Sequence, residues 1–116
     1  MTRLADGQAA ESLAADYLQR HGLAVLERNY RSLHGEIDLV CREGDTLVFV
    51  EVRYRSRSDY GTPAETVGAH KQARLRATAE HYLLTHRGCK CNGRFDIVAV
   101  SGNLADATLE WLKNAF

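Results

Sequence analysis

The 116-residue sequence has one proline, one tryptophan and three cysteines, and it contains no long apolar run. A membrane-spanning helix needs about 20 consecutive apolar residues, and residues 1–7 do not begin the apolar segment of a signal peptide. An odd number of cysteines suggests no disulfide framework. Cys89 and Cys91 lack a second pair and are a weak zinc signal, so we interpret them as free thiols. We therefore expect a cytoplasmic protein with no membrane partner.

The sequence also lacks a net charge, but its charges are segregated along the chain. Residues 1–52 contain five Lys or Arg against nine Asp or Glu, whereas residues 53–94 contain nine against three. An acidic cluster beside a basic tract suits a site that holds a cation and faces a polyanion. A solvated helix face followed by a charged loop explains the same pattern equally well.

Length and composition fit a single α/β domain over residues 1–116, large enough to bury about two-thirds of its unfolded surface. Periodicity and turn residues predict the order helix, three strands, helix, strand, strand. The predicted helices span residues 7–21 and 69–86, and the predicted strands span residues 23–30, 36–42, 46–53, 94–100 and 108–112. A polar loop is expected over residues 54–63.

The second and third strands form a hairpin whose register follows from its turn. Gly44-Asp45 suits a two-residue primed turn, which places Glu43 opposite Thr46 and Asp38 opposite Glu51. The two Cβ atoms would then lie about 5 Å apart, and two charges at that distance repel by about 3 kcal/mol at an effective dielectric near 20. A divalent cation between the carboxylates removes that cost. The alternative is an ordinary surface ladder of salt bridges that includes Arg53.

Alternation along the hairpin predicts a polar end on one face and a dry packing surface on the other. Glu51 and Arg53 share a face. The dry face is predicted to contain Ile37, Leu39 and Cys41 against Val48, Val50 and Val52. Both faces are therefore expected to be covered, as in the middle of a layered α/β fold.

Two further carboxylates lie in apolar surroundings. Glu11 flanks the apolar stripe of the first helix and needs a partner there, although a position near a helix N-terminus is also favoured by the helix dipole. Asp96 interrupts a buried strand, and we interpret it as a hydrogen-bonded core residue rather than a charge at a sheet edge.

The element order, with an acidic residue on the first helix, Asp on the second strand and E-x-R on the third, resembles the PD-(D/E)-x-K nuclease superfamily. Within it, the sequence resembles the YraN-type family of bacterial proteins, which is similar to archaeal Holliday-junction resolvases. The matching stretches are ERNYR at 27–31, GEIDLV at 35–40, LVFVEVR at 47–53, RFDIV at 94–98 and KNAF at 113–116.

The resemblance implies a restriction-endonuclease-like core and an endonuclease that cleaves phosphodiester bonds in DNA, with structured or branched DNA favoured. It makes Glu11, Asp38 and Glu51 the carboxylates around Mg²⁺ or Mn²⁺, with the Val52 carbonyl as a further ligand. Arg53 takes the position that is usually lysine. A guanidinium stays protonated, so it cannot act as a base, although it can clamp a phosphate.

The basic tract is the expected contact surface for nucleic acid. Its members are Arg55, Arg57, Lys71, Gln72, Arg74 and Arg76. Lys71 or Gln72 could also supply a donor to the site from the start of the second helix, and a solvated helix end is the alternative.

Two other functions stay open at this point. One is a nucleic-acid-binding module that keeps the fold and the carboxylates without cleaving. The other is an interaction protein whose acidic cluster is only a salt-bridge network. The sequence leaves the oligomeric state undecided, a homodimer included.

Overall fold

The computed structural model describes residues 3–55, 67–86 and 92–116. Two helices and five strands follow the predicted order, with one added turn of 3-10 helix. The elements are α1 (Arg3–Arg20), β1 (Ala24–Ser32), β2 (Gly35–Glu43), β3 (Thr46–Arg55), α2 (Ala69–Thr85), β4 (Asn92–Ser101), η2 (Leu104–Asp106) and β5 (Thr108–Leu112). The predicted bounds of β5 are confirmed, and α1 begins earlier than the sequence indicated. In this part of the chain no helix is both long and apolar enough to cross a membrane.

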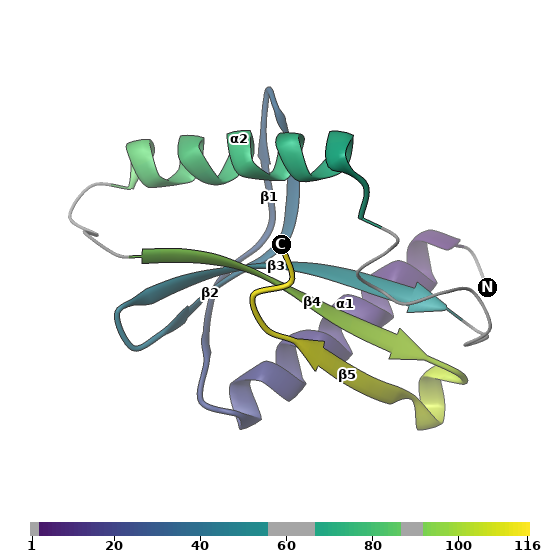
Figure 1. Ribbon diagram of the computed structural model, residues 1–116. Helices are drawn as coiled ribbons and strands as arrows, with labels where there is room; N and C mark the ends of the chain where they lie inside the picture. Colours follow the sequence, from purple (N-terminus) through teal and green to yellow (C-terminus); the bar gives the residue numbers. More distant parts are fainter. Residues whose placement is uncertain (1–2, 56–66, 87–91) are drawn as a thin grey trace.

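The strands form one mixed sheet in the order β1-β2-β3-β4-β5. Only the β3–β4 pair is parallel, and the other three neighbouring pairs are antiparallel. A parallel pair needs a crossover connection, and α2 lies in the segment that joins β3 to β4. Figure 1 shows α1 and α2 on opposite faces of the sheet, so the predicted α/β layer architecture is confirmed.

The predicted hairpin register is confirmed over the length that is paired. Glu43 lies opposite Thr46, and the pairing continues without a shift to Leu39 opposite Val50. Gly44 adopts φ = +59°, which a primed turn with glycine at its first central position requires. Leu39 with Val50 is the last backbone pair of the hairpin, so the pairing of β2 with β3 ends one residue before Asp38.

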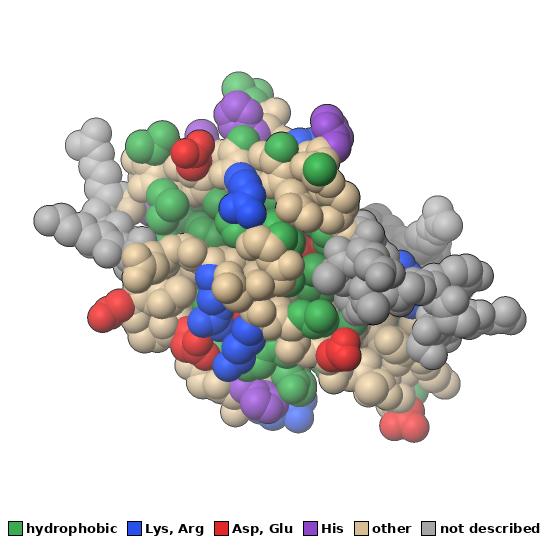
Figure 2. All heavy atoms as spheres, viewed as in Figure 1, with side chains coloured by type: hydrophobic (Ala, Val, Ile, Leu, Met, Phe, Trp, Pro, Cys, Tyr) green, Lys and Arg blue, Asp and Glu red, His purple; other side chains and the backbone are tan. Residues whose placement is uncertain are grey.

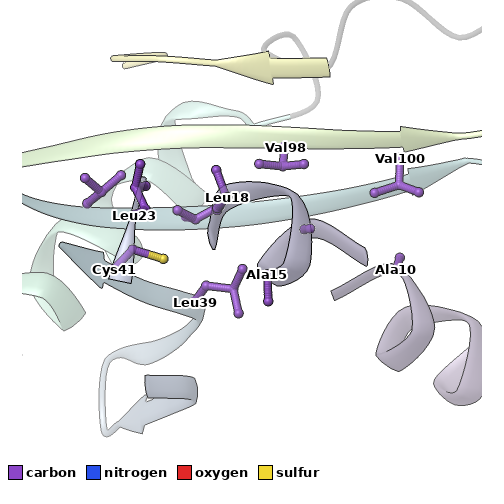
Figure 3. Close-up of a cluster of buried hydrophobic side chains, with 11 residues drawn as sticks. Ala10, Ala15, Leu18, Leu23, Leu39, Cys41, Val98 and Val100 are labelled. Carbon is purple, nitrogen blue, oxygen red and sulfur yellow. The ribbon is translucent and has the colours of Figure 1, made fainter. Parts of the chain in front are cut away.

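Each face of the sheet has its own hydrophobic core. The core on the α1 side contains four residues of the helix that pack on buried residues of β2, β3 and β4: Ala10, Ala14, Ala15 and Leu18. Figure 3 shows these side chains gathered between α1 and the sheet. Three alanines on this face of α1 let the helix approach the strands closely, because they add little side-chain bulk. The core on the α2 side includes Val40, Phe49, Leu75 and Tyr82.

Ile37 corrects the predicted packing of the hairpin. It was expected on the dry face with Leu39, but it belongs to the core on the α2 side. The break in alternation coincides with Asn29 on the adjacent strand β1, which lies between the paired positions Arg28–Leu39 and Tyr30–Ile37 and adopts a left-handed backbone with φ = +53°. From there the β1–β2 hairpin turns toward α2 (Figure 1), where Arg74 Nε donates to the His34 carbonyl at 3.4 Å.

Gly35 allows this crossing. Its φ is +152°, and a Cβ added there would lie 3.3 Å from Thr78 Oγ1 of α2. A side chain at this position would therefore have a strained backbone and a tight contact with Thr78.

Asp96 is a buried, hydrogen-bonded residue within the sheet, as the sequence predicted. It is fully buried on β4 and accepts hydrogen bonds from the Arg94 guanidinium, from Trp111 Nε1 at 2.9 Å and from the Asn114 backbone N–H at 2.9 Å. Arg94 also donates to Glu43 at 2.7 Å. One carboxylate therefore links β4 to β5, to the chain that follows β5, and to the end of β2.

We expect Asp96→Ala to lower the free energy of unfolding by about 3–5 kcal/mol, because it leaves several buried donors without their acceptor. The measurement is urea denaturation. Asp106→Ala is the matched control, since Asp106 is exposed, and should change stability by less than about 0.5 kcal/mol. Equal stability losses in the two variants would contradict the role assigned to Asp96.

Candidate functional site

Strands β2 and β3 separate at Asp38, and the side chain of this residue replaces a backbone contact. Asp38 Oδ2 accepts a hydrogen bond from the Val52 backbone N–H at 2.8 Å. The last backbone pair of the hairpin is Leu39 with Val50. A buried N–H needs an acceptor, so the Asp38 carboxylate allows β2 to leave β3 without an unsatisfied donor. We refer to this opening as the fork.

Glu51 lies inside the fork. It is only 6% exposed, and its Oε1 accepts a hydrogen bond from Lys71 Nζ of α2 at 3.2 Å. Its carboxyl group also shares a side-chain hydrogen bond with Asp38. A hydrogen bond between two carboxyl groups needs a proton on one of them, so this contact favours the protonated form of Asp38 and raises its pKa.

Burial and the neighbouring charge have a large effect on the acidity of Asp38. Its pKa rises from 3.8 to about 7, first because burial disfavours the charged form, then because of the Glu51 charge and the hydrogen bond with Glu51. The Val52 N–H and the Lys71 ammonium act in the opposite direction. Two close carboxylates that cannot both ionise are characteristic of catalytic and cation-binding sites.

Glu11 of α1 borders the same site. Its pKa rises to about 7 through burial, followed by the charges of Asp38 and Glu36, while Arg28 lowers it. Of the three predicted carboxylates, Asp38 thus interacts with Glu51, and Glu11 is affected by the charge of Asp38. Across residues 3–55, 67–86 and 92–116, however, no three His, Cys, Asp or Glu side chains form a group that could hold a metal ion.

Val52 and Arg53 lie beside the fork on β3. The contact that Val52 makes with Asp38 is through its backbone N–H, whereas the sequence suggested a role for its carbonyl. Arg53 lies opposite Ala99 of β4 and is half-buried. By strand alternation its side chain is on the Glu51 side of the sheet.

The described members of the predicted basic tract make different contacts. Lys71 contacts Glu51, whereas Gln72 Nε2 donates to the Val67 carbonyl at 2.9 Å and helps to order the start of α2. The Arg76 guanidinium lies over the rings of Phe95 and Phe116, with centroid distances of 5.2 and 5.8 Å.

The remaining members of the tract are distributed over several elements. Arg55 ends β3, and its carbonyl accepts from the Gly102 N–H at 2.9 Å, while Arg74 reaches the β1–β2 hairpin. Arg57 lies outside the described residues. Figure 2 shows Lys and Arg side chains in separate groups on this face, one of them over α2.

Asn29 is the site residue that sequence reasoning missed. Its amide nitrogen donates to Glu11 Oε1 at 2.8 Å and to Glu36 Oε1 at 2.9 Å, because the opposite orientation would set its oxygen against two carboxylate oxygens. Glu36 also pairs with Arg31 at 3.4 Å. The available signal was an asparagine inside a strand pattern, which is a residue that tolerates left-handed backbone.

The fold and the fork define a small mixed α/β protein with a buried acidic pair where its central hairpin opens. A family model described as "Uncharacterised protein family UPF0102" matches residues 10–100. The chain is 50% identical over 115 residues to a UPF0102 protein of Dechloromonas aromatica, a match that covers 99% of this chain and 91% of the relative.

Two further relatives carry the same family description. A UPF0102 protein of Methylococcus capsulatus is 53% identical over 109 residues, covering 94% of this chain and 88% of the relative. One from Nitrosomonas europaea is 51% identical over 111 residues, covering 95% and 92%. The chain therefore belongs to the UPF0102 family, and the resemblance to YraN-type proteins is confirmed.

The raised pKa of Asp38 predicts a stability that depends on pH. Between pH 4 and 7 the folded state binds more protons than the unfolded chain, so the free energy of unfolding falls as pH rises through that window. Asp38→Asn keeps an acceptor for Val52 and gives Glu51 a permanent donor. With chelator present, the variant should exceed the wild type at pH 8 by on the order of 1 kcal/mol, and the pH dependence should become shallower.

Urea denaturation at pH 5 and pH 8 tests this expectation. Asp106→Asn, an exposed control, should follow the wild-type profile. A variant that is less stable than the wild type at both pH values would show that the Asp38 charge stabilises the fold.

Proposed function

We propose that this protein is a metal-dependent endonuclease that hydrolyses phosphodiester bonds in DNA, with the fork as its active site. The observation that carries the proposal is the contact of the Asp38 carboxyl group with the buried Glu51 carboxyl group, beside Lys71. Two buried carboxylates in contact are costly for stability alone, and a bound cation is a chemical reason to retain them.

The donors at the fork suit Mg²⁺ or Mn²⁺. Both are hard cations that take oxygen ligands, and Mg²⁺ keeps several waters and binds through one or two carboxylates plus substrate phosphate. Asp38 and Glu51 supply that pair, and Glu11 is the neighbouring third carboxylate. A set of two explains why the described residues contain no group of three that could hold a metal. When bound, such a cation lowers the pKa of a coordinated water and neutralises charge on the scissile phosphate.

Lys71 and Arg53 would together take the role of the lysine that the superfamily pattern places on the third strand. Lys71 reaches Glu51 from α2, so a compact ammonium is available to orient a water or to carry a proton at the fork. The guanidinium of Arg53 presents its N–H donors in one plane and is suited to hold a phosphate oxygen.

Nucleic acid is the substrate class that the charges favour. Arg55 continues β3 away from the fork, and Arg74 lies on α2, the helix that also carries Lys71. Phosphate contacts from such residues position a nucleic acid without reading its sequence. A non-catalytic binding module is the second candidate, because Arg53 replaces the usual lysine at the site.

The deciding experiment is a cleavage assay on branched, duplex and single-stranded DNA with Mg²⁺ and with Mn²⁺. We expect cleavage with at least one substrate, and we expect Asp38→Asn to reduce the rate at least about 100-fold, because the variant loses a ligand and a charge at the fork. Asp106→Asn is the control and should retain the wild-type rate. DNA binding without cleavage under either cation would favour the binding module, and the absence of both would exclude the two candidates together.

A second pair of variants separates the two cationic side chains. Lys71→Gln should lower the cleavage rate about tenfold or more, because it removes the ammonium from Glu51, whereas Arg53→Lys should keep the rate or improve it. Single-turnover rates at saturating DNA distinguish this chemical effect from weakened binding. If Arg53→Lys loses tenfold while Lys71→Gln retains its rate, Arg53 is the essential group and the assignment of Lys71 is wrong.

A further inference from the structure

Leu33 is the most exposed large hydrophobic side chain in the described part of the chain. Its relative exposure is 103%, against 77% for Leu84 and 41% for Leu26. It lies in the turn between β1 and β2, after the last paired positions of that hairpin, Ser32 and Gly35. Figure 1 shows the hairpin extending past α2, and the same view in Figure 2 shows hydrophobic side-chain atoms at that projecting end. We refer to residues 32–35 as the hairpin tip.

The turn itself does not call for a leucine. Short turns favour Gly, Asn, Asp and Ser, and two-residue hairpin turns favour positive φ. Gly44 meets that preference in the turn between β2 and β3, whereas Leu33 and His34 are not among the described non-glycine residues with positive φ. Single exposed leucines are common on protein surfaces. This one is distinguished by its place at the end of a projecting hairpin whose turn gives no reason for it.

The hairpin tip is held in place by polar contacts. The His34 backbone N–H donates to Ser32 Oγ at 3.0 Å, and the His34 carbonyl accepts from Arg74 Nε of α2 at 3.4 Å. Gly35 lies close to Thr78 of the same helix. A side chain presented on an ordered support can enter a partner without first paying the entropy of ordering the turn.

The charges near the tip favour a polyanion as the partner. The Arg31 side chain on β1 is 75% exposed, and Arg74 on α2 is exposed as well. The nearest acidic residue along the hairpin, Glu36, is paired with Arg31 at 3.4 Å. A second copy docked here in a symmetric contact would bring the same cations together, whereas the phosphates of DNA would place negative charge opposite them.

Helix α2 connects the hairpin tip to the fork. Arg74 contacts the tip and Lys71 contacts Glu51, and positions three apart are neighbours on one side of a helix. Along β2, Asp38 follows Leu33 by five residues, so their Cα atoms are at most about 18 Å apart. DNA rises by about 3.4 Å per base pair. The tip and the fork are therefore within reach of one DNA segment of about five base pairs.

We propose that Leu33 is an apolar wedge that inserts between bases and makes the protein selective for DNA in which base stacking is already interrupted. The inference rests on the proposed action on DNA. Burial of one leucine side chain is worth roughly a tenfold to hundredfold gain in affinity, and opening a stacked step of an intact duplex costs about as much or more. Insertion therefore gains most at a gap, a nick or a branch point, where part of that cost is absent.

The test compares two fluorescein-labelled duplexes of the same sequence, one continuous and one with a single-nucleotide gap. Affinities are measured by fluorescence polarization at fixed salt, with chelator and then with Mg²⁺. The wild type should bind the gapped duplex about tenfold or more tightly than the continuous one. Leu33→Ser should reduce this preference below about threefold and change affinity for the continuous duplex less than about twofold, because it removes only the wedge. Leu33→Phe keeps a large apolar side chain and should retain the preference.

Leu84→Ser is the matched control, because it removes a second exposed leucine, at the opposite end of α2 from Lys71. It should keep the wild-type preference. If the wild type binds DNA and Leu33→Ser also keeps its preference, this inference alone is wrong. If the wild type binds neither duplex under either condition, the inference and the proposed function fail together. A dimer that the wild type forms without DNA and Leu33→Ser does not form, measured by sedimentation, would assign the hairpin tip to contact between copies and overturn the proposal.

Discussion

The hydrogen bond from the Val52 N–H to the Asp38 carboxylate decides where the central hairpin opens, and the rest of the site depends on it. A strand can leave its neighbour only if the backbone donors it abandons find other acceptors. Asp38 supplies that acceptor from its own side chain. β2 is then able to turn toward α2, where Gly35 packs against Thr78, and Glu51 contacts Lys71 of α2 beyond the end of the strand pair. The position that ends the pairing is therefore also the position that creates the acidic pair.

This arrangement links both layers of the fold to one group of charges. α1 contributes Glu11, held through Asn29, and α2 contributes Lys71, which contacts Glu51. The opposite end of the same hairpin is anchored by Glu43 on Arg94 and, through Arg94, on the buried Asp96. The two polar centres differ in character. Asp96 accepts hydrogen bonds from several donors and serves the structure, whereas the charge of Glu51 raises the pKa of Asp38. The charges of Asp38 and Glu51 repel at the fork, whereas the Asp96 carboxylate is matched by hydrogen-bond donors. This difference favours a functional interpretation of the fork.

Much of this could be predicted from the sequence because the evidence was local. Gly44-Asp45 determined the register that brings Asp38 to Glu51, and hydrophobic periodicity gave the order of the elements. The side of the sheet taken by Ile37 could not be predicted, because strict alternation fails once Asn29 turns the neighbouring strand. Lys71 was expected as a possible donor to the site, and it contacts Glu51. The position of Arg76 over the Phe95 and Phe116 rings could not be predicted, because that contact joins a helix to distant parts of the chain.

The central claim is that the fork binds a divalent cation between Asp38 and Glu51. The most direct measurement is anomalous diffraction from crystals of the protein grown with Mn²⁺ at pH 8. The account predicts an anomalous peak within about 2.0–2.6 Å of carboxylate oxygens from both Asp38 and Glu51. A peak bound only elsewhere on the protein, with the hydrogen bond between the two carboxyl groups still in place, would contradict it.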